Sequence, residues 1–315
     1  MEFQIKKYKN GDEKFILDVF SKTFNRQMSY KYWKWRYLDN PYINTNYINL
    51  AWDNERLAAH YALSPIQIYI NGNGYNAALS MTTMTDPDYQ GMGLFTKLAN
   101  TLFCEYNKDL DIIFGVPNDN SVKGFTKKLD FKLIKEISML EAKVEDKKYC
   151  INPKCLEIKQ FDERFDELFN LVVTKYKVIT VRNSNYLNWR FVHNPDNQYK
   201  IFSYMDDNKV LGYIVIKIYN GLEILTGDIV DILADNENVL NDLLNSAFSY
   251  FYSMKVSNVN LWYNDMNYIK TINSYGFHTS EKRFHFIVRD NSDSIKDGIF
   301  NYENWYLTMS DIDLF

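Results

Sequence analysis

One seven-residue motif occurs twice in the sequence, about 150 residues apart, and this duplication restricts the fold more than any other feature. The two copies are Trp35-Arg36-Tyr37-Leu38-Asp39-Asn40-Pro41 and Trp189-Arg190-Phe191-Val192-His193-Asn194-Pro195. Further anchors follow in the same order, Asn118-Asp119 with Phe131 and Asn264-Asp265 with Phe277. Solenoid repeats are only roughly 20 to 50 residues long. Two copies at the longer spacing therefore predict a duplicated domain.

Length and composition agree with two folded domains. The chain has 315 residues, of which 46% are hydrophobic and 24% are charged. A formal net charge of -4 provides no overall basic field for a nucleic acid. The start, MEFQIKKYKNGDEKF, lacks the apolar core of a signal peptide, and no apolar run of about eighteen residues is present. We therefore expect a cytoplasmic protein with neither a nucleic-acid nor a membrane partner.

The cysteines predict neither a disulfide framework nor a metal site. Cys104, Cys150 and Cys155 are too few and too unevenly spaced for a set of disulfides. Cys150 and Cys155 have no nearby histidine or second cysteine pair that could complete a zinc site. We expect ordinary thiols and no metal.

Hydrophobic spacing predicts the order of elements in the first half of the chain. Residues 12–25 have apolar side chains at helical spacing, and strand-like runs separated by turn signals follow at 47–53, 56–70 and 76–85. A second helical stripe begins after Pro87. The last expected elements are a buried strand at 111–117, a helix and turn at 120–131, and a closing strand at 134–144.

The most informative local sequence is DPDYQGMGLFTKL, residues 86–98, between the third strand and the second helix. A tight turn there leaves unpaired backbone N–H groups at the positive end of a helix dipole, where phosphate can bind. Gly91 and Gly93 lack side chains, so a diphosphate can approach the backbone. A Walker loop would need Lys and then Ser or Thr after Gly93, and a dinucleotide loop would need glycine in place of Thr96. Neither pattern is present.

The segment Gln90-Gly91-Met92-Gly93-Leu94-Phe95 resembles the acyl-coenzyme A loop of the GCN5-related N-acetyltransferases (GNATs). Phe95 departs from that signature, but the enhanced-intracellular-survival type, which has tandem domains, tolerates a large apolar residue there. The resemblance implies an α/β (α+β) protein with two tandem GNAT-like domains, each a mixed, mostly antiparallel sheet flanked by helices. It places the acyl-CoA site in residues 1–148, a domain without the glycine loop in 156–290, and a C-terminal tail in 291–315.

The same resemblance assigns roles to residues. The backbone N–H of Thr83 would stabilise the oxyanion, and amides from Gln90 to Thr96 would hold the pyrophosphate. The implied cofactor-binding residues are Thr83, Met84, Thr85, Gln90, Gly91, Met92, Gly93, Leu94, Phe95, Thr96 and Asn118. Strand propensity alone also accounts for Thr83 and Thr85.

The usual proton-transfer residues of the family are absent. Leu79 stands where some relatives have a glutamate base, and Phe125 stands where many have a tyrosine acid. A C-terminal carboxylate serves as the base in the enhanced-intracellular-survival type, which makes that of Phe315, or an aspartate of the tail, a candidate. Alternatively the tail only packs against the second domain. His60 is either near the acceptor or a structural histidine of a strand.

These features lead to one expected activity and two alternatives. The expected activity is transfer of an acyl group from acyl-CoA, with acetyl-CoA as the expected donor, to a primary amine of a small molecule or sugar. Absence of the customary glutamate and tyrosine also permits an inactive acyl-CoA-binding or scaffold protein. A peptidyl transferase that uses aminoacyl-tRNA is disfavoured, because the loop lacks the additional Lys and Arg that a tRNA partner would require.

Overall fold

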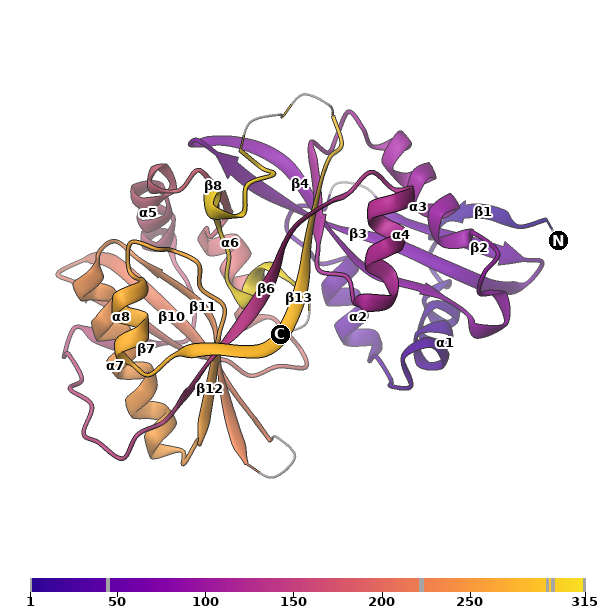
Figure 1. The fold of residues 1–315 in the computed structure, drawn as a ribbon. Helices are drawn as coiled ribbons and strands as arrows, with labels where there is room; N and C mark the ends of the chain where they lie inside the picture. The colour runs from indigo at the N-terminus through magenta and orange to yellow at the C-terminus, as the bar shows by residue number, and fades with distance from the viewer. Residues whose placement is uncertain (1, 44–45, 221–223, 293–294, 296–297, 314–315) are drawn as a thin grey trace. The chain divides into compact units, whose positions relative to one another are not determined.

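The computed structural model describes residues 2–43, 46–220, 224–292, 295 and 298–313. Contacts divide the chain into two compact units, and neither unit is one continuous stretch of sequence. Unit 1 consists of Met1–Ile68, Gly74–Glu136 and Phe284–Phe300, and unit 2 consists of Tyr69–Asn73, Ile137–Arg283 and Asn301–Phe315. Figure 1 shows that each unit contains a sheet with helices packed against it.

A mixed, mostly antiparallel sheet forms the centre of unit 1 (Figure 1). Its order is β1 (Gln4–Lys7), β2 (Ile48–Asp53), β3 (Arg56–Ile70), β4 (Asn73–Thr85), β5 (Ile112–Gly115), β13 (His278–Asp290) and β6 (Lys132–Lys143). β4 and β5 are parallel, whereas β1–β2, β2–β3 and β5–β13 are antiparallel. Asn71 and Gly72 both have positive φ, which suits the two-residue turn between β3 and β4. The strands predicted between residues 47 and 85 are confirmed.

Helices cover both faces of this sheet. They are α1 (Glu13–Phe24), α2 (Tyr30–Tyr37), α3 (Leu94–Glu105) and α4 (Asp119–Lys128). Successive residues of a strand point to opposite faces. His60 of β3 contacts Tyr37 of α2, with ring centroids 6.0 Å apart, and the next residue, Tyr61, contacts Phe103 of α3 at 5.7 Å. α2 and α3 therefore lie on opposite faces of the sheet.

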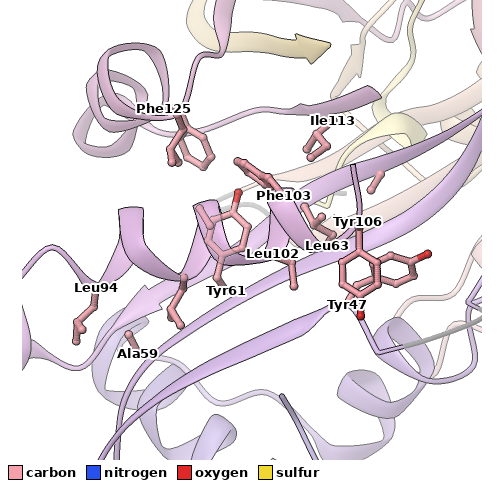
Figure 2. Packing of buried hydrophobic residues seen from close by; sticks show 14 of the residues in the cluster. Tyr47, Ala59, Tyr61, Leu63, Leu94, Leu102, Phe103, Tyr106, Ile113 and Phe125 are labelled. Carbon is pink, nitrogen blue, oxygen red and sulfur yellow. The ribbon is translucent and has the colours of Figure 1, made fainter. Parts of the chain in front are cut away.

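The core beneath α3 explains why this helix begins directly after the glycine loop. Its buried residues recur at helical spacing, and they are Leu94, Leu98, Ala99, Leu102 and Phe103. Leu94, Leu102 and Phe103 belong to one buried cluster with residues of the sheet and with Phe125 of α4, and Figure 2 shows these side chains. Burial of this apolar stripe stabilises the helix and fixes the position of its N-terminus.

β6 and β13 each contribute to both units. β6 begins in unit 1 and continues into unit 2 from Ile137, whereas β13 begins in unit 2 and continues into unit 1 from Phe284. Residues 287–290 of β13 pair with β5. A strand from the second half of the sequence thus completes the sheet that carries the glycine loop. The sequence did not predict that β6 and β13 each pass from one unit to the other, which we call the strand exchange. The domain boundaries at residues 148 and 156 stay a prediction.

Unit 2 repeats the order of elements found in unit 1. Its further elements are β7 (Cys155–Ile158), α5 (Glu163–Val172), β8 (Val178–Thr180), α6 (Ser184–Leu187), β9 (Lys200–Asp206), β10 (Lys209–Asn220), β11 (Leu225–Ala234), α7 (Glu237–Ser253), β12 (Asn258–Leu261), α8 (Ile269–Ser274) and β14 (Trp305–Tyr306). β11 and β12 are parallel and are joined by α7, as β4 and β5 are joined by α3. The repeated Trp-Arg pair lies in α2 and in the π-helical turn η3 (Asn188–Val192).

Candidate functional site

The approach to the glycine loop is held by a buried carboxylate. Asp86 follows β4 and is 1% exposed; its side chain accepts hydrogen bonds from the Asp88 N–H at 3.1 Å and from Arg56 at 3.0 Å. Burial alone would raise the pKa of Asp86, but these hydrogen bonds outweigh it and hold the pKa below its usual value. Tyr89 donates to Asp53 of β2 at 2.8 Å. These contacts tie the segment that leads into the loop to β2 and β3.

The loop exposes backbone at the start of α3. Gly91 and Gly93 have φ of 79° and 74°, in the left-handed region that favours glycine, and Gly93 is the N-cap of the helix. Nothing lies within 4 Å of the position that a Cβ would occupy at either glycine. The first hydrogen bond of the helix runs from the Lys97 N–H to the Gly93 carbonyl at 3.1 Å. The N–H groups of residues 94–96 precede this bond and are oriented to bind an anion.

β4 continues beyond its pairing with β5. The parallel pairing covers Ala77–Leu79 of β4, whereas β4 runs on to Thr85 and β5 ends at Gly115. Within the continuation, Thr82 has a φ of 48°, although it is β-branched. Thr83 and Thr85 are half-buried, and Met84 between them is 2% exposed. Met84 therefore points into the core, while its two neighbours point the other way.

Phe95, which departs from the family signature, has a packing role. Its ring lies 5.0 Å from that of Phe125, edge to face. A Cβ at Gly124 would stand 2.9 Å from Cε1 of Phe95, so the glycine on α4 leaves room for the large side chain. Leu79 and Phe125 are 6% and 4% exposed. The two positions at which relatives have proton-transfer groups are thus part of the apolar core.

Asn118 is the N-cap of α4. Its side chain accepts hydrogen bonds from the Ser121 N–H at 3.0 Å and from the Ser121 hydroxyl at 2.9 Å. Asn118 is exposed at the carboxyl end of β5, where the resemblance places it, and its contacts are those of a helix cap.

A contact between a histidine and an aspartate that the sequence did not suggest lies beside Asn118. His285 of β13 has its Nε2 atom 2.6 Å from Oδ1 of Asp119, the first residue of α4. The two residues are separated by 166 positions, and only the exchange of β13 brings them together. No local signal in the sequence could have linked them.

The candidate bases of the tail have different positions. Phe315 lies outside the described residues. Asp311 is 3% exposed, and its Oδ2 accepts a hydrogen bond from Arg182 at 2.8 Å. Trp305 and Tyr306 are each 2% exposed. This segment therefore packs within unit 2, and Asp311 is engaged by a buried guanidinium.

The corresponding junction in unit 2 lacks a glycine loop. Only two residues separate the end of β11 from the start of α7, and the side chain of Asn236 caps the helix by accepting a hydrogen bond from the Val239 N–H. Among the described residues, no group of three or more His, Cys, Asp or Glu side chains is placed to hold a metal ion. No helix in the described ranges combines the length and apolar character needed to cross a membrane.

Comparisons with known proteins match a family model to residues 4–134 and solved structures of similar fold to nearly the whole chain. Residues 4–134 match the family model described as the acetyltransferase (GNAT) domain. No curated protein sequence matches the chain. A probable N-acyltransferase from Enterococcus faecalis has a similar structure, with a TM-score of 0.71 and 15% identity, over 93% of this chain and 73% of that chain.

Two further solved structures cover nearly the whole chain. A GCN5-related N-acetyltransferase from Anabaena variabilis has a TM-score of 0.70 and 14% identity, over 92% of this chain and 73% of that chain. Saccharomyces cerevisiae N-myristoyltransferase, solved with bound myristoyl-CoA, has a TM-score of 0.66 and 10% identity, over 92% of this chain and 79% of that chain. At such identities the likeness establishes a shared fold.

Proposed function

Since residues 4–134 match the acetyltransferase (GNAT) domain of the GCN5-related N-acetyltransferases, we propose that this chain is an acyl-CoA-dependent N-acyltransferase. The proposed donor is acetyl-CoA, and the proposed acceptor is a primary amine of a small molecule or sugar. The observation that carries the proposal is the exposed turn from Gln90 to Gly93 at the N-terminus of α3. The backbone N–H groups of residues 94–96, which follow this turn and precede the first hydrogen bond of α3, suit a diphosphate, which is an anionic part of coenzyme A.

The proposed reaction is direct attack on the thioester. The amine nitrogen forms a bond to the carbonyl carbon, the carbon–sulfur bond breaks, coenzyme A leaves as a thiolate, and one proton passes from nitrogen to the thiolate or to solvent. The backbone N–H of Thr83 would donate to the oxygen that becomes negative. Gly91 and Gly93 would let the diphosphate approach the loop, and Asn118 would border the cofactor at the end of β5.

One observation favours the second candidate, an inactive acyl-CoA-binding or scaffold protein. Leu79 and Phe125 replace the usual acid–base groups and are buried, so neither position can transfer a proton. Release of free thiol separates the two candidates. An enzyme releases it from acetyl-CoA when a panel of primary amines is supplied, whereas an inactive protein binds acetyl-CoA and releases none.

A charge at the loop tests the cofactor site. Gly93→Asp places a carboxylate next to the diphosphate, and we expect it to weaken binding of coenzyme A at least about tenfold in calorimetry. Gly276→Asp is the matched control, because Gly276 is also exposed, has a φ of 83° and has nothing within 4 Å of its Cβ position. The control should bind coenzyme A like the wild type. Unchanged binding in Gly93→Asp would refute the site.

A further inference from the structure

His60 lies on β3 with one hydrogen bond to the neighbouring strand. It is 1% exposed, and its Nδ1 atom is 2.9 Å from the carbonyl oxygen of Thr82 on β4. A carbonyl oxygen can only accept, so Nδ1 carries the proton and donates it. Burial lowers the pKa of His60 to about 4, against the smaller effect of this hydrogen bond, so the ring is neutral near pH 7.

The acceptor belongs to a strained residue. Thr82 has a φ of 48°, which a β-branched side chain rarely adopts. Such a conformation persists only where surrounding contacts hold it. Tyr61 and Ser80 share a hydrogen bond of 2.7 Å, and Nε of Arg36 lies 3.2 Å from Sδ of Met81. Side chains from β3 and α2 thus contact three successive residues of β4.

The geometry of the peptide group connects His60 with the proposed oxyanion donor. The carbonyl of Thr82 and the N–H of Thr83 belong to the same peptide bond, which is planar and trans, as no cis peptide occurs among the described residues. In a trans peptide the C=O and N–H bonds point in opposite directions. Because His60 donates to the Thr82 oxygen, it fixes the orientation of this peptide plane and with it the direction in which the Thr83 N–H points. The same hydrogen bond polarises the Thr83 N–H.

We propose that His60 is a positioning residue that aims the Thr83 N–H at the thioester oxygen through their shared peptide plane. This inference rests on the proposed function for its catalytic consequence. His60 itself does not contact the substrate in this role. It is neutral and buried, and its single hydrogen bond to the backbone is part of the frame that holds the donor.

Two substitutions of nearly equal shape test the role of the donor. Asn keeps a donor close to the place of Nδ1, and Leu of similar size has none. We expect His60→Leu to lower kcat at least about tenfold, because small displacements of catalytic groups can cost up to roughly a hundredfold. The affinity for coenzyme A should stay unchanged, since the glycine loop is untouched. His60→Asn should recover most of the lost rate.

A control and a coupled substitution make the test specific. His278→Leu removes an exposed histidine whose Nδ1 also lies near a backbone carbonyl, that of Gly276 at 3.3 Å, and it should leave kcat unchanged. Thr82→Gly removes the strain at φ 48°, because glycine adopts that conformation freely. In the Thr82→Gly background, His60→Leu should lose less of kcat than it does alone.

A measurement without turnover separates this inference from the proposed function. The backbone amide resonance of Thr83 should move further in His60→Leu than in His60→Asn, relative to the wild type. If wild-type protein releases no thiol with any amine, the proposed function fails, and the resonance still reports on His60. Equal shifts in the two variants, or equal values of kcat in His60→Leu and the wild type, would overturn the role of His60.

Discussion

The buried neutral state of His60 makes the stability of the protein depend on pH in a calculable way. The unfolded chain has a histidine pKa of about 6.5, whereas burial lowers the pKa of His60 in the folded protein to about 4. Between these values the unfolded state binds a proton that the folded state excludes. The contribution of His60 to the free energy of unfolding is therefore fully present above about pH 6.5, and it decreases as the pH falls toward about 4.

The size of the effect follows from the two pKa values. Each pH unit within the window is equivalent to about 1.4 kcal/mol, so His60 should cost about 2 kcal/mol at pH 5.0 relative to pH 7.5. Urea unfolding at the two pH values measures the total change, to which carboxylates also contribute. His60→Asn lacks only the histidine part, so it should lose about 2 kcal/mol less than the wild type. Parallel pH curves for the two proteins would refute a buried, neutral His60.

Three further substitutions test packing and capping, each by urea unfolding. Gly212→Ala should cost about 1–3 kcal/mol, because the new Cβ would lie 2.7 Å from Cγ1 of Val239, and unchanged stability would contradict the close contact of α7 with β10. Arg182→Met should lower the free energy of unfolding by about 3–5 kcal/mol, because the buried carboxylates of Asp231 and Asp311 lose their cation. A decrease below about 1 kcal/mol would argue against these buried ion pairs. Asn118→Ala should cost about 1 kcal/mol through loss of the cap on Ser121, whereas Asn118→Asp should cost little.

The conformation of the loop at residues 90–93 was predictable because its signal is local. Two closely spaced glycines after a strand and before an amphipathic helix require positive φ and an exposed helix N-terminus, and both occur at Gly91 and Gly93. Phe95 departs from the family signature, and its large side chain fits because residue 124 is glycine. Nothing in the sequence near either residue indicates that the two are in contact. A pairwise size compensation between two helices becomes visible only in three dimensions.

The geometry around Thr82 could not be predicted, for a different reason. The sequence shows a threonine in a strand, and β-branched residues favour extended backbone. Side chains of β3 and α2 contact residues 80–82, and one of them is His60, 22 residues earlier, which hydrogen-bonds to the Thr82 carbonyl. Contacts between residues so far apart leave no pattern in the local sequence. The strand exchange is similarly non-local, because β13 pairs with β5 across more than half of the chain. The sequence of a single strand does not indicate which distant strand it pairs with or in which register.

The placement of β13 also constrains how the protein matures on the ribosome. Domains generally fold as units while the chain emerges, the N-terminal one first. Here the edge of β5 stays unpaired on one side until residues 287–290 have been synthesised, so unit 1 cannot be completed when its own half of the gene has been translated. A nascent chain that stalls early would present an open strand edge, which is prone to aggregation. Neither half of the gene should yield a stable product when expressed alone.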